Sequence, residues 1–109
     1  PILLSEGVNK NKISLQQLVE LTSMNASKIF GMKSKGSIEI GFDADITIID
    51  LKKEEKATSF LFGGFSDYLV YDDWMLKGWP VRTIVRGETI SQDFEVIGRS
   101  GFGELVPRN

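Results

Sequence analysis

Residues 36–50 read Gly-Ser-Ile-Glu-Ile-Gly-Phe-Asp-Ala-Asp-Ile-Thr-Ile-Ile-Asp, and this stretch decides the fold. The alternation of isoleucine with polar residues predicts a short strand over residues 37–40. Gly41 and Asp43 then predict a turn, because glycine tolerates positive φ and aspartate can hydrogen-bond its own backbone. Residues 44–50 are rich in β-branched side chains, which predicts a second and longer strand.

A helix is expected well before this stretch, beginning at Ser14. Ser14 and Gln17 form a capping-box pattern, in which each side chain accepts a hydrogen bond from the backbone N–H of the other residue. The residues that follow have the spacing of one helix face. This apolar stripe comprises Leu15, Leu18, Val19, Leu21 and Thr22.

A second, shorter helix is expected over residues 26–30. Asn25 is a favourable N-cap for it, and Gly31 is a favourable end. Ile29 and Phe30 are its expected buried residues.

The sequence after Asp50 changes character twice. Residues 51–56 carry charges of both signs, which indicates a solvated strand end or loop. Residues 57–79 hold seven of the eleven aromatic side chains without a clean period, which predicts a long loop. So many aromatic side chains must pack against the core of this chain or against another surface, and packing is a commoner cause than an aromatic ligand site.

A meander of short strands is expected after Pro80. Alternating residues predict a strand over 81–86, a turn at 87–88, a return over 89–91 and a third strand over 94–97. The glycine-rich tail is expected to run extended over a surface. The fold class predicted for this chain is therefore α+β, two helices followed by β-strands.

Composition excludes several function classes. The 109 residues carry 13 basic and 15 acidic side chains, and this net charge of −2 argues against an electrostatic nucleic-acid binder. The chain contains neither cysteine nor histidine, which removes disulfides, thiolate metal sites and imidazole bases. It shows no long apolar run and no signal peptide, so a cytoplasmic setting is expected. It begins at Pro1, and we expect a piece of a longer polypeptide.

The carboxylates Asp43, Asp45 and Asp50 are the most suggestive polar groups. An Asp-x-Asp pair on a turn can bind a divalent cation, but turn and strand-entry chemistry explains these residues more simply. No base is available to activate Ser5, Ser66 or Ser100 as a nucleophile. No catalytic, cofactor-binding or metal-binding residue is expected on this chain.

Several separated motifs together resemble the C-terminal end of the amidohydrolase superfamily. Asn-Ala-Ser-Lys-Ile-Phe-Gly (25–31) and the Lys-Gly-x-Ile-x-x-Gly-x-Asp-Ala-Asp pattern (35–45) resemble the superfamily as a whole. Four further motifs resemble its cyclic amidohydrolase branch: residues 66–68, 71–80, 83–87 and 101–108. Two positions depart from the pattern, Ala26 in place of the usual proline and Asp73 in place of glycine.

The resemblance implies a parent with a (β/α)₈ barrel of the TIM type and a small β-sandwich built from both chain ends. Residues 1–34 would be the last barrel helices, and residues 35–109 the C-terminal part of the sandwich, with the aromatic loop 57–79 packed where the two meet. Such enzymes hold two metal ions, usually zinc, with histidines, a carboxylated lysine and an aspartate. These ligands precede Pro1 in the family pattern, so this chain is expected to bind no metal itself.

Dihydroorotase is the branch that the motifs resemble most. The parent would then interconvert N-carbamoyl-L-aspartate and dihydroorotate in pyrimidine biosynthesis, while this segment is inactive alone. The alternatives are allantoinase, hydantoinase/dihydropyrimidinase and a non-catalytic amidohydrolase-like scaffold protein. The expected partners are the missing barrel and N-terminal sandwich strands and further copies in a homo-oligomer, but neither nucleic acid nor membrane.

Overall fold

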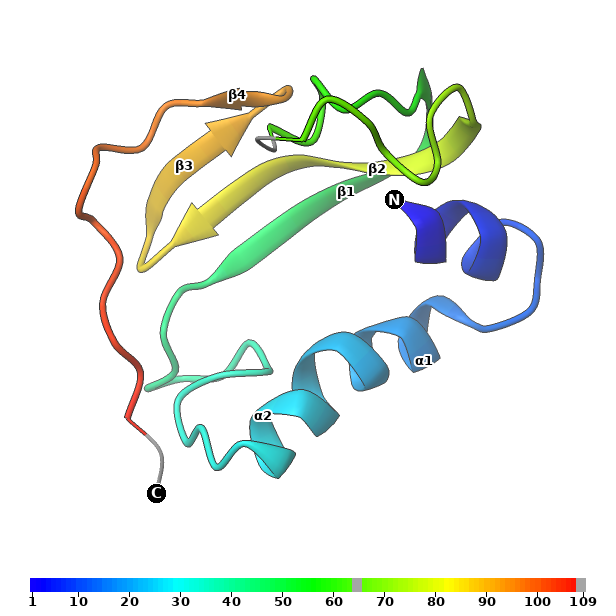
Figure 1. Ribbon diagram of the computed structural model, residues 1–109. Coiled ribbons are helices and arrows are strands. Elements are labelled where there is room, and N and C mark those ends of the chain that lie inside the picture. Colours follow the sequence, from blue (N-terminus) through cyan, green and yellow to red (C-terminus); the bar gives the residue numbers. More distant parts are fainter. Residues whose placement is uncertain (64–65, 108–109) are drawn as a thin grey trace.

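The computed structural model describes residues 1–63 and 66–107 (Figure 1). Helical segments occupy the first 30 residues, and a four-stranded antiparallel sheet follows them. This order confirms the α+β prediction for the chain. In the described part, no helix is both long and apolar enough to span a membrane.

The two helices predicted to begin at Ser14 and after Asn25 form one continuous helical stretch. The short π-helical segment η1 covers Leu3–Val8, and α1 (Leu15–Val19), η2 (Glu20–Met24) and α2 (Asn25–Ile29) follow one another without a break. The capping box at Ser14 is confirmed, because Gln17 N–H donates to Ser14 Oγ at 3.0 Å and Ser14 N–H donates to Gln17 Oε1 at 2.8 Å. Asn25 is not an N-cap. It has helical φ and ψ of −68° and −38°, and its N–H donates to the Glu20 carbonyl inside the continuous helix.

The predicted burial of the helix residues was partly wrong. Leu18 is buried, but Ile29 and Phe30 at the end of α2 are 78% and 49% exposed. Leu18, Val19 and Thr22 of the apolar stripe line an open groove, whereas Leu15 and Leu21 are 41% and 61% exposed.

The strand predicted over residues 37–40 does not form. The chain there folds back in a loop, in which Phe42 N–H donates to the Glu39 carbonyl and Asp43 N–H donates to the Ser34 carbonyl. Ile38 and Ile40 project from this loop and are 83% and 106% exposed. A strand needs a neighbour to satisfy its backbone groups, and in the described residues this segment has none.

The sheet consists of β1 (Ile46–Lys56), β2 (Met75–Val85), β3 (Glu88–Gln92) and β4 (Glu95–Val96), paired in that order. β1 extends through the mixed-charge cluster, and β2 begins at Met75, so the aromatic loop is shorter than the predicted 57–79. The first hairpin turn is Arg86–Gly87, one residue earlier than predicted.

The pairing of β1 with β2 is interrupted twice. The register shifts between Ile48 and Ile49 and again between Asp50 and Glu54. Pro80 is paired opposite Ile49, next to the first shift, where a residue without an N–H is tolerated. At the second shift Asp50 Oδ1 accepts hydrogen bonds from the N–H groups of Lys52 and Lys53, at 2.8 and 3.1 Å. Asp50 thus satisfies backbone donors that the ladder leaves unpaired.

The core lies under the aromatic loop. Leu76 and Trp79 of β2 are almost completely buried together with Ala57. Trp79 Nε1 donates to the Leu76 carbonyl at 2.9 Å, and the ring of Phe94 lies edge-on at a centroid distance of 5.3 Å.

The aromatic loop packs on this core only in part. Phe62 contacts Trp79 at a centroid distance of 5.8 Å, whereas Phe60 and Tyr68 are exposed. Gly64 and Phe65, which the predicted loop includes, lie outside the described residues.

Hydrogen bonds join segment η1 and the residue after it to β1 and β2, near the second register shift. Asn9 Nδ2 donates to the carbonyl of Lys77 at 2.6 Å and to the carbonyl of Leu51 at 3.2 Å, so one side chain connects β1 and β2. Lys77 N–H in turn donates to Ser5 Oγ at 3.1 Å. At Gly78, with φ of +99°, a Cβ would lie 2.9 Å from Leu4 Cβ. A larger residue there would push η1 away from the sheet.

Candidate functional site

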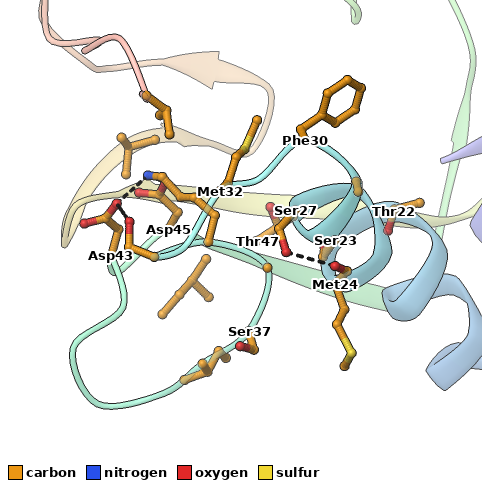
Figure 2. Close-up of a pocket in the computed structure, with 18 of the residues that line it drawn as sticks. Thr22, Ser23, Met24, Ser27, Phe30, Met32, Ser37, Asp43, Asp45 and Thr47 are labelled. Atoms are coloured by element: carbon orange, nitrogen blue, oxygen red, sulfur yellow. Dashed lines mark hydrogen bonds and ion pairs between the residues drawn. The ribbon is translucent and has the colours of Figure 1, made fainter. Parts of the chain in front are cut away.

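A cluster of polar contacts surrounds Lys35, just before β1. Its partners Asp43 and Asp45 are labelled in Figure 2. Lys35 Nζ forms ion pairs with Asp43 Oδ2, at 2.9 Å, and with Asp45 Oδ2. Ser34 Oγ donates to Asp43 Oδ2 at 2.9 Å, and Arg86 N–H donates to Asp45 Oδ1 at 2.8 Å. We call Ser34, Lys35, Asp43 and Asp45 the Lys35 cluster. It ties the loop before β1 to the turn between β2 and β3.

The charges of the Lys35 cluster stabilise one another. Hydrogen bonds to Asp45 and Asp43 raise the pKa of Lys35 above its ordinary value. Hydrogen bonds from Lys35 and Ser34 lower the pKa of Asp43. Burial raises the pKa of Asp45, but the hydrogen bonds from Lys35 and from Arg86 N–H outweigh it, and the pKa lies below its ordinary value. The ammonium and both carboxylates therefore stay charged over the neutral range.

The position of Lys35 depends on the next residue. Gly36 has φ of +95°, and a Cβ there would lie 2.3 Å from Ser27 Oγ and 2.8 Å from Ser27 Cβ. Ser27 is buried and donates to the Met24 carbonyl at 2.9 Å. The Lys-Gly pair of the motif thus combines an ion-pairing side chain with a backbone that can lie against α2.

A groove of about 1170 Å³ opens beside the Lys35 cluster. Figure 2 shows Asp43 and Asp45 on one side of it and the helix residues Thr22, Ser23 and Ser27 on the other. Its lining is mostly apolar and includes Leu18, Val19, Phe30, Ile46, Val85 and Val106. It is an open surface between the helix, β1 and the tail.

The residues present do not fit a two-metal centre. The sequence has no histidine or cysteine, and no three Asp or Glu residues converge within residues 1–63 and 66–107. The two carboxylates that do converge, Asp43 and Asp45, are held by Lys35 at strand entry. The third carboxylate, Asp50, lies farther along β1 at the register shift.

Sequence reasoning missed three residues that hold the fold together. Asn9 and Ser5 act across 68 and 72 residues of sequence, and no local pattern marks such pairs. Arg86 could have been suspected, because it precedes a glycine in a two-residue hairpin turn.

Comparison with known proteins gives the family. The profile described as Amidohydrolase family matches residues 2–90. The L-hydantoinase of Paenarthrobacter aurescens is 38% identical over 109 residues, which are 99% of this chain and 24% of that protein. The dihydroorotase of Pyrococcus furiosus is 40% identical over 106 residues, which are 97% of this chain and 25% of that protein.

The solved structures agree. The L-hydantoinase from Arthrobacter aurescens matches 99% of this chain, and 24% of its own, with a TM-score of 0.94 and 38% identity. The D-hydantoinase from Thermus sp. matches 98% of this chain with a TM-score of 0.91 and 28% identity. The chain spans about a quarter of the length of these relatives, and it belongs to the amidohydrolase family.

Proposed function

We propose that these residues are the C-terminal structural part of a metal-dependent cyclic amidohydrolase. The observation that supports it is the similarity of nearly the whole chain both to a hydantoinase and to a dihydroorotase, at 38% and 40% identity. Both names denote enzymes of one chemical class, and dihydroorotase is the activity that we propose first. Hydantoinase/dihydropyrimidinase and allantoinase are the alternatives.

The chemistry would reside in other parts of the full-length protein. The amidohydrolase family is generally metal-dependent, yet the residues described here do not fit a metal centre. We therefore place the metal ligands, for zinc as the proposed metal, outside these 109 residues, and we assign no catalytic or metal-binding role to any of them. The parent's setting is proposed to be cytoplasmic.

The contribution of this segment would be architectural. Residues 1–34 would close a (β/α)₈ barrel, and residues 35–109 would supply part of a β-sandwich. Two features support this. β1 is eleven residues long and lies at the edge of the sheet, and an apolar groove separates it from the helix. Unpaired edges and apolar grooves are normally covered.

The substrate is tested with the full-length protein. Purified protein with added zinc is assayed against dihydroorotate, hydantoin and allantoin, with ring opening followed by absorbance or chromatography. Hydrolysis of dihydroorotate, and formation of dihydroorotate from N-carbamoyl-L-aspartate, are expected. Hydrolysis of hydantoin alone would replace the proposed activity by the alternative, and turnover by the isolated 109 residues would contradict their structural role.

A non-catalytic scaffold is the second candidate, because its C-terminal part would have the same motifs. The full-length sequence distinguishes the two, since an enzyme needs a His-x-His motif, further histidines and an aspartate. Their absence, together with no turnover of any cyclic amide, would favour the scaffold. In either case we expect a homo-oligomer, which light scattering of the full-length protein tests.

A further inference from the structure

Arg86 adopts a backbone conformation that arginine rarely takes. It has φ of +45°, and Gly87 after it has φ of +83°, so both central residues of the hairpin turn between β2 and β3 are left-handed. A two-residue hairpin favours such a turn, but asparagine or glycine suits the first position far better than arginine. An unfavourable backbone at a non-glycine residue persists only when its other contacts compensate.

The side chain of Arg86 makes those contacts with the tail, which we define as residues 98–107. Arg86 Nη2 donates to the Phe102 carbonyl and lies 3.5 Å from Glu104 Oε1. The Arg86 guanidinium lies 4.3 Å from the centroid of the Phe102 ring, and that of Arg99 lies 5.3 Å from it.

Backbone pairing of the tail with the sheet stops early. Ile97 and Gly98 both donate to the Ile90 carbonyl at 2.9 Å. Beyond Gly98, Arg86 supplies a hydrogen bond to the Phe102 carbonyl and an ion pair to Glu104. Figure 1 shows the tail, in orange and red, running from β4 past the loop that precedes β1. Residues 103–107 form one side of the apolar groove.

We propose that the Arg86 side chain holds the tail in place along one side of the groove. Its backbone N–H is fixed by Asp45, so the Lys35 cluster positions the arginine and the arginine positions the tail. Loss of the Arg86 side chain, or of the Phe102 ring against which it stacks, releases residues 99–107 from the sheet while the hairpin itself remains intact.

Limited trypsin digestion of the full-length protein tests the proposal. Cleavage after Arg99 is measured by mass spectrometry, as the rate at which the fragment beginning at Ser100 forms. Arg86→Asn is the informative variant, because asparagine suits the left-handed position and preserves the turn. Phe102→Ala removes the ring without touching the hairpin. The control is Arg82→Gln, at an exposed arginine of the same strand.

We expect Arg86→Asn and Phe102→Ala to be cleaved about tenfold faster than the wild type, since cleavage follows the population of the open tail. Arg82→Gln should be cleaved at the wild-type rate. Unchanged rates in the first two variants would overturn the proposal. Acceleration in Arg86→Asn but not in Phe102→Ala would place the effect in the hairpin, and equal acceleration in Arg82→Gln would indicate general loosening. Either of these two results would also overturn the proposal.

Discussion

Replacement of Gly36 by alanine probes the close approach between the Lys35 loop and α2. The new Cβ would lie 2.3 Å from Ser27 Oγ and 2.8 Å from Ser27 Cβ, distances that require the loop or the helix to move. The left-handed backbone, with φ of +95°, adds roughly 1–2 kcal/mol for a residue with a side chain. Overpacking in a tight contact adds about 1–3 kcal/mol. We expect Gly36→Ala to lower the free energy of unfolding by about 3 kcal/mol.

A double-mutant cycle separates the two contributions. Ser27→Gly removes the two atoms that the new Cβ would approach most closely and leaves the Ser23 carbonyl oxygen at 3.0 Å. Gly36→Ala in that background should therefore cost mainly the backbone part, about 1–2 kcal/mol. The free energies come from urea titrations of the 109-residue chain, followed by tryptophan fluorescence. Gly103→Ala is the matched control, because a Cβ there meets nothing within 4 Å, and its cost should stay below about 0.5 kcal/mol.

Two results would refute the reasoning. An unchanged urea midpoint in Gly36→Ala would mean that the loop does not press on α2. An equal cost of Gly36→Ala with and without Ser27→Gly would mean that the backbone, and not the contact with Ser27, limits this position.

Three further predictions follow from the contacts described above. Lys35→Met should be less stable than the wild type between about pH 5 and 9. The difference should shrink in acid, as the pH falls through the lowered pKa values of Asp43 and Asp45, and in alkali, as it rises through the raised pKa of Lys35. Urea midpoints measured across this pH range test the prediction, and a pH-independent difference would contradict it. Trp79→Ala should cost about 3–5 kcal/mol because the ring fills the core, and a loss under 1 kcal/mol would contradict that core. Asn9→Ala should lower the free energy of unfolding by about 1–3 kcal/mol, because it leaves the carbonyls of Leu51 and Lys77 without this partner. In this variant, amide exchange should accelerate more in η1 than in β3.

Local patterns predicted the elements that are stabilised locally. The capping box at Ser14 depends on residues three apart, and the hairpins after Pro80 depend on two-residue turns. The capping box formed as predicted, and each hairpin turn lies one residue from its prediction, although β2 begins at Met75 and not after Pro80. The strand predicted over 37–40 failed for the opposite reason, since alternation shows that a segment can pair but not that a neighbour exists.

The candidate site also contains features that local sequence predicts and features that it does not. The positions of Asp43 and Asp45 before β1 were predictable from the motif, whereas their ion pairs with Lys35 were not. The exposed side chains of Ile29 and Phe30 were not predictable, because helix periodicity assigns a face to the interior whether or not this chain supplies the covering surface. The bonds of Asn9 to Leu51 and Lys77 cross a sheet whose register was unknown.

The central claim, that this segment supports a cyclic amidohydrolase without taking part in its chemistry, is tested most directly by kcat of the full-length protein. Wild type and the Asp43→Asn and Asp45→Asn variants are compared with zinc and dihydroorotate, after circular dichroism has shown that each variant is folded. We expect the wild type to hydrolyse the cyclic amide and both variants to keep kcat within about threefold, or about 0.7 kcal/mol in the activation barrier. A loss of more than about a hundredfold in a folded variant with unchanged zinc content would contradict the claim.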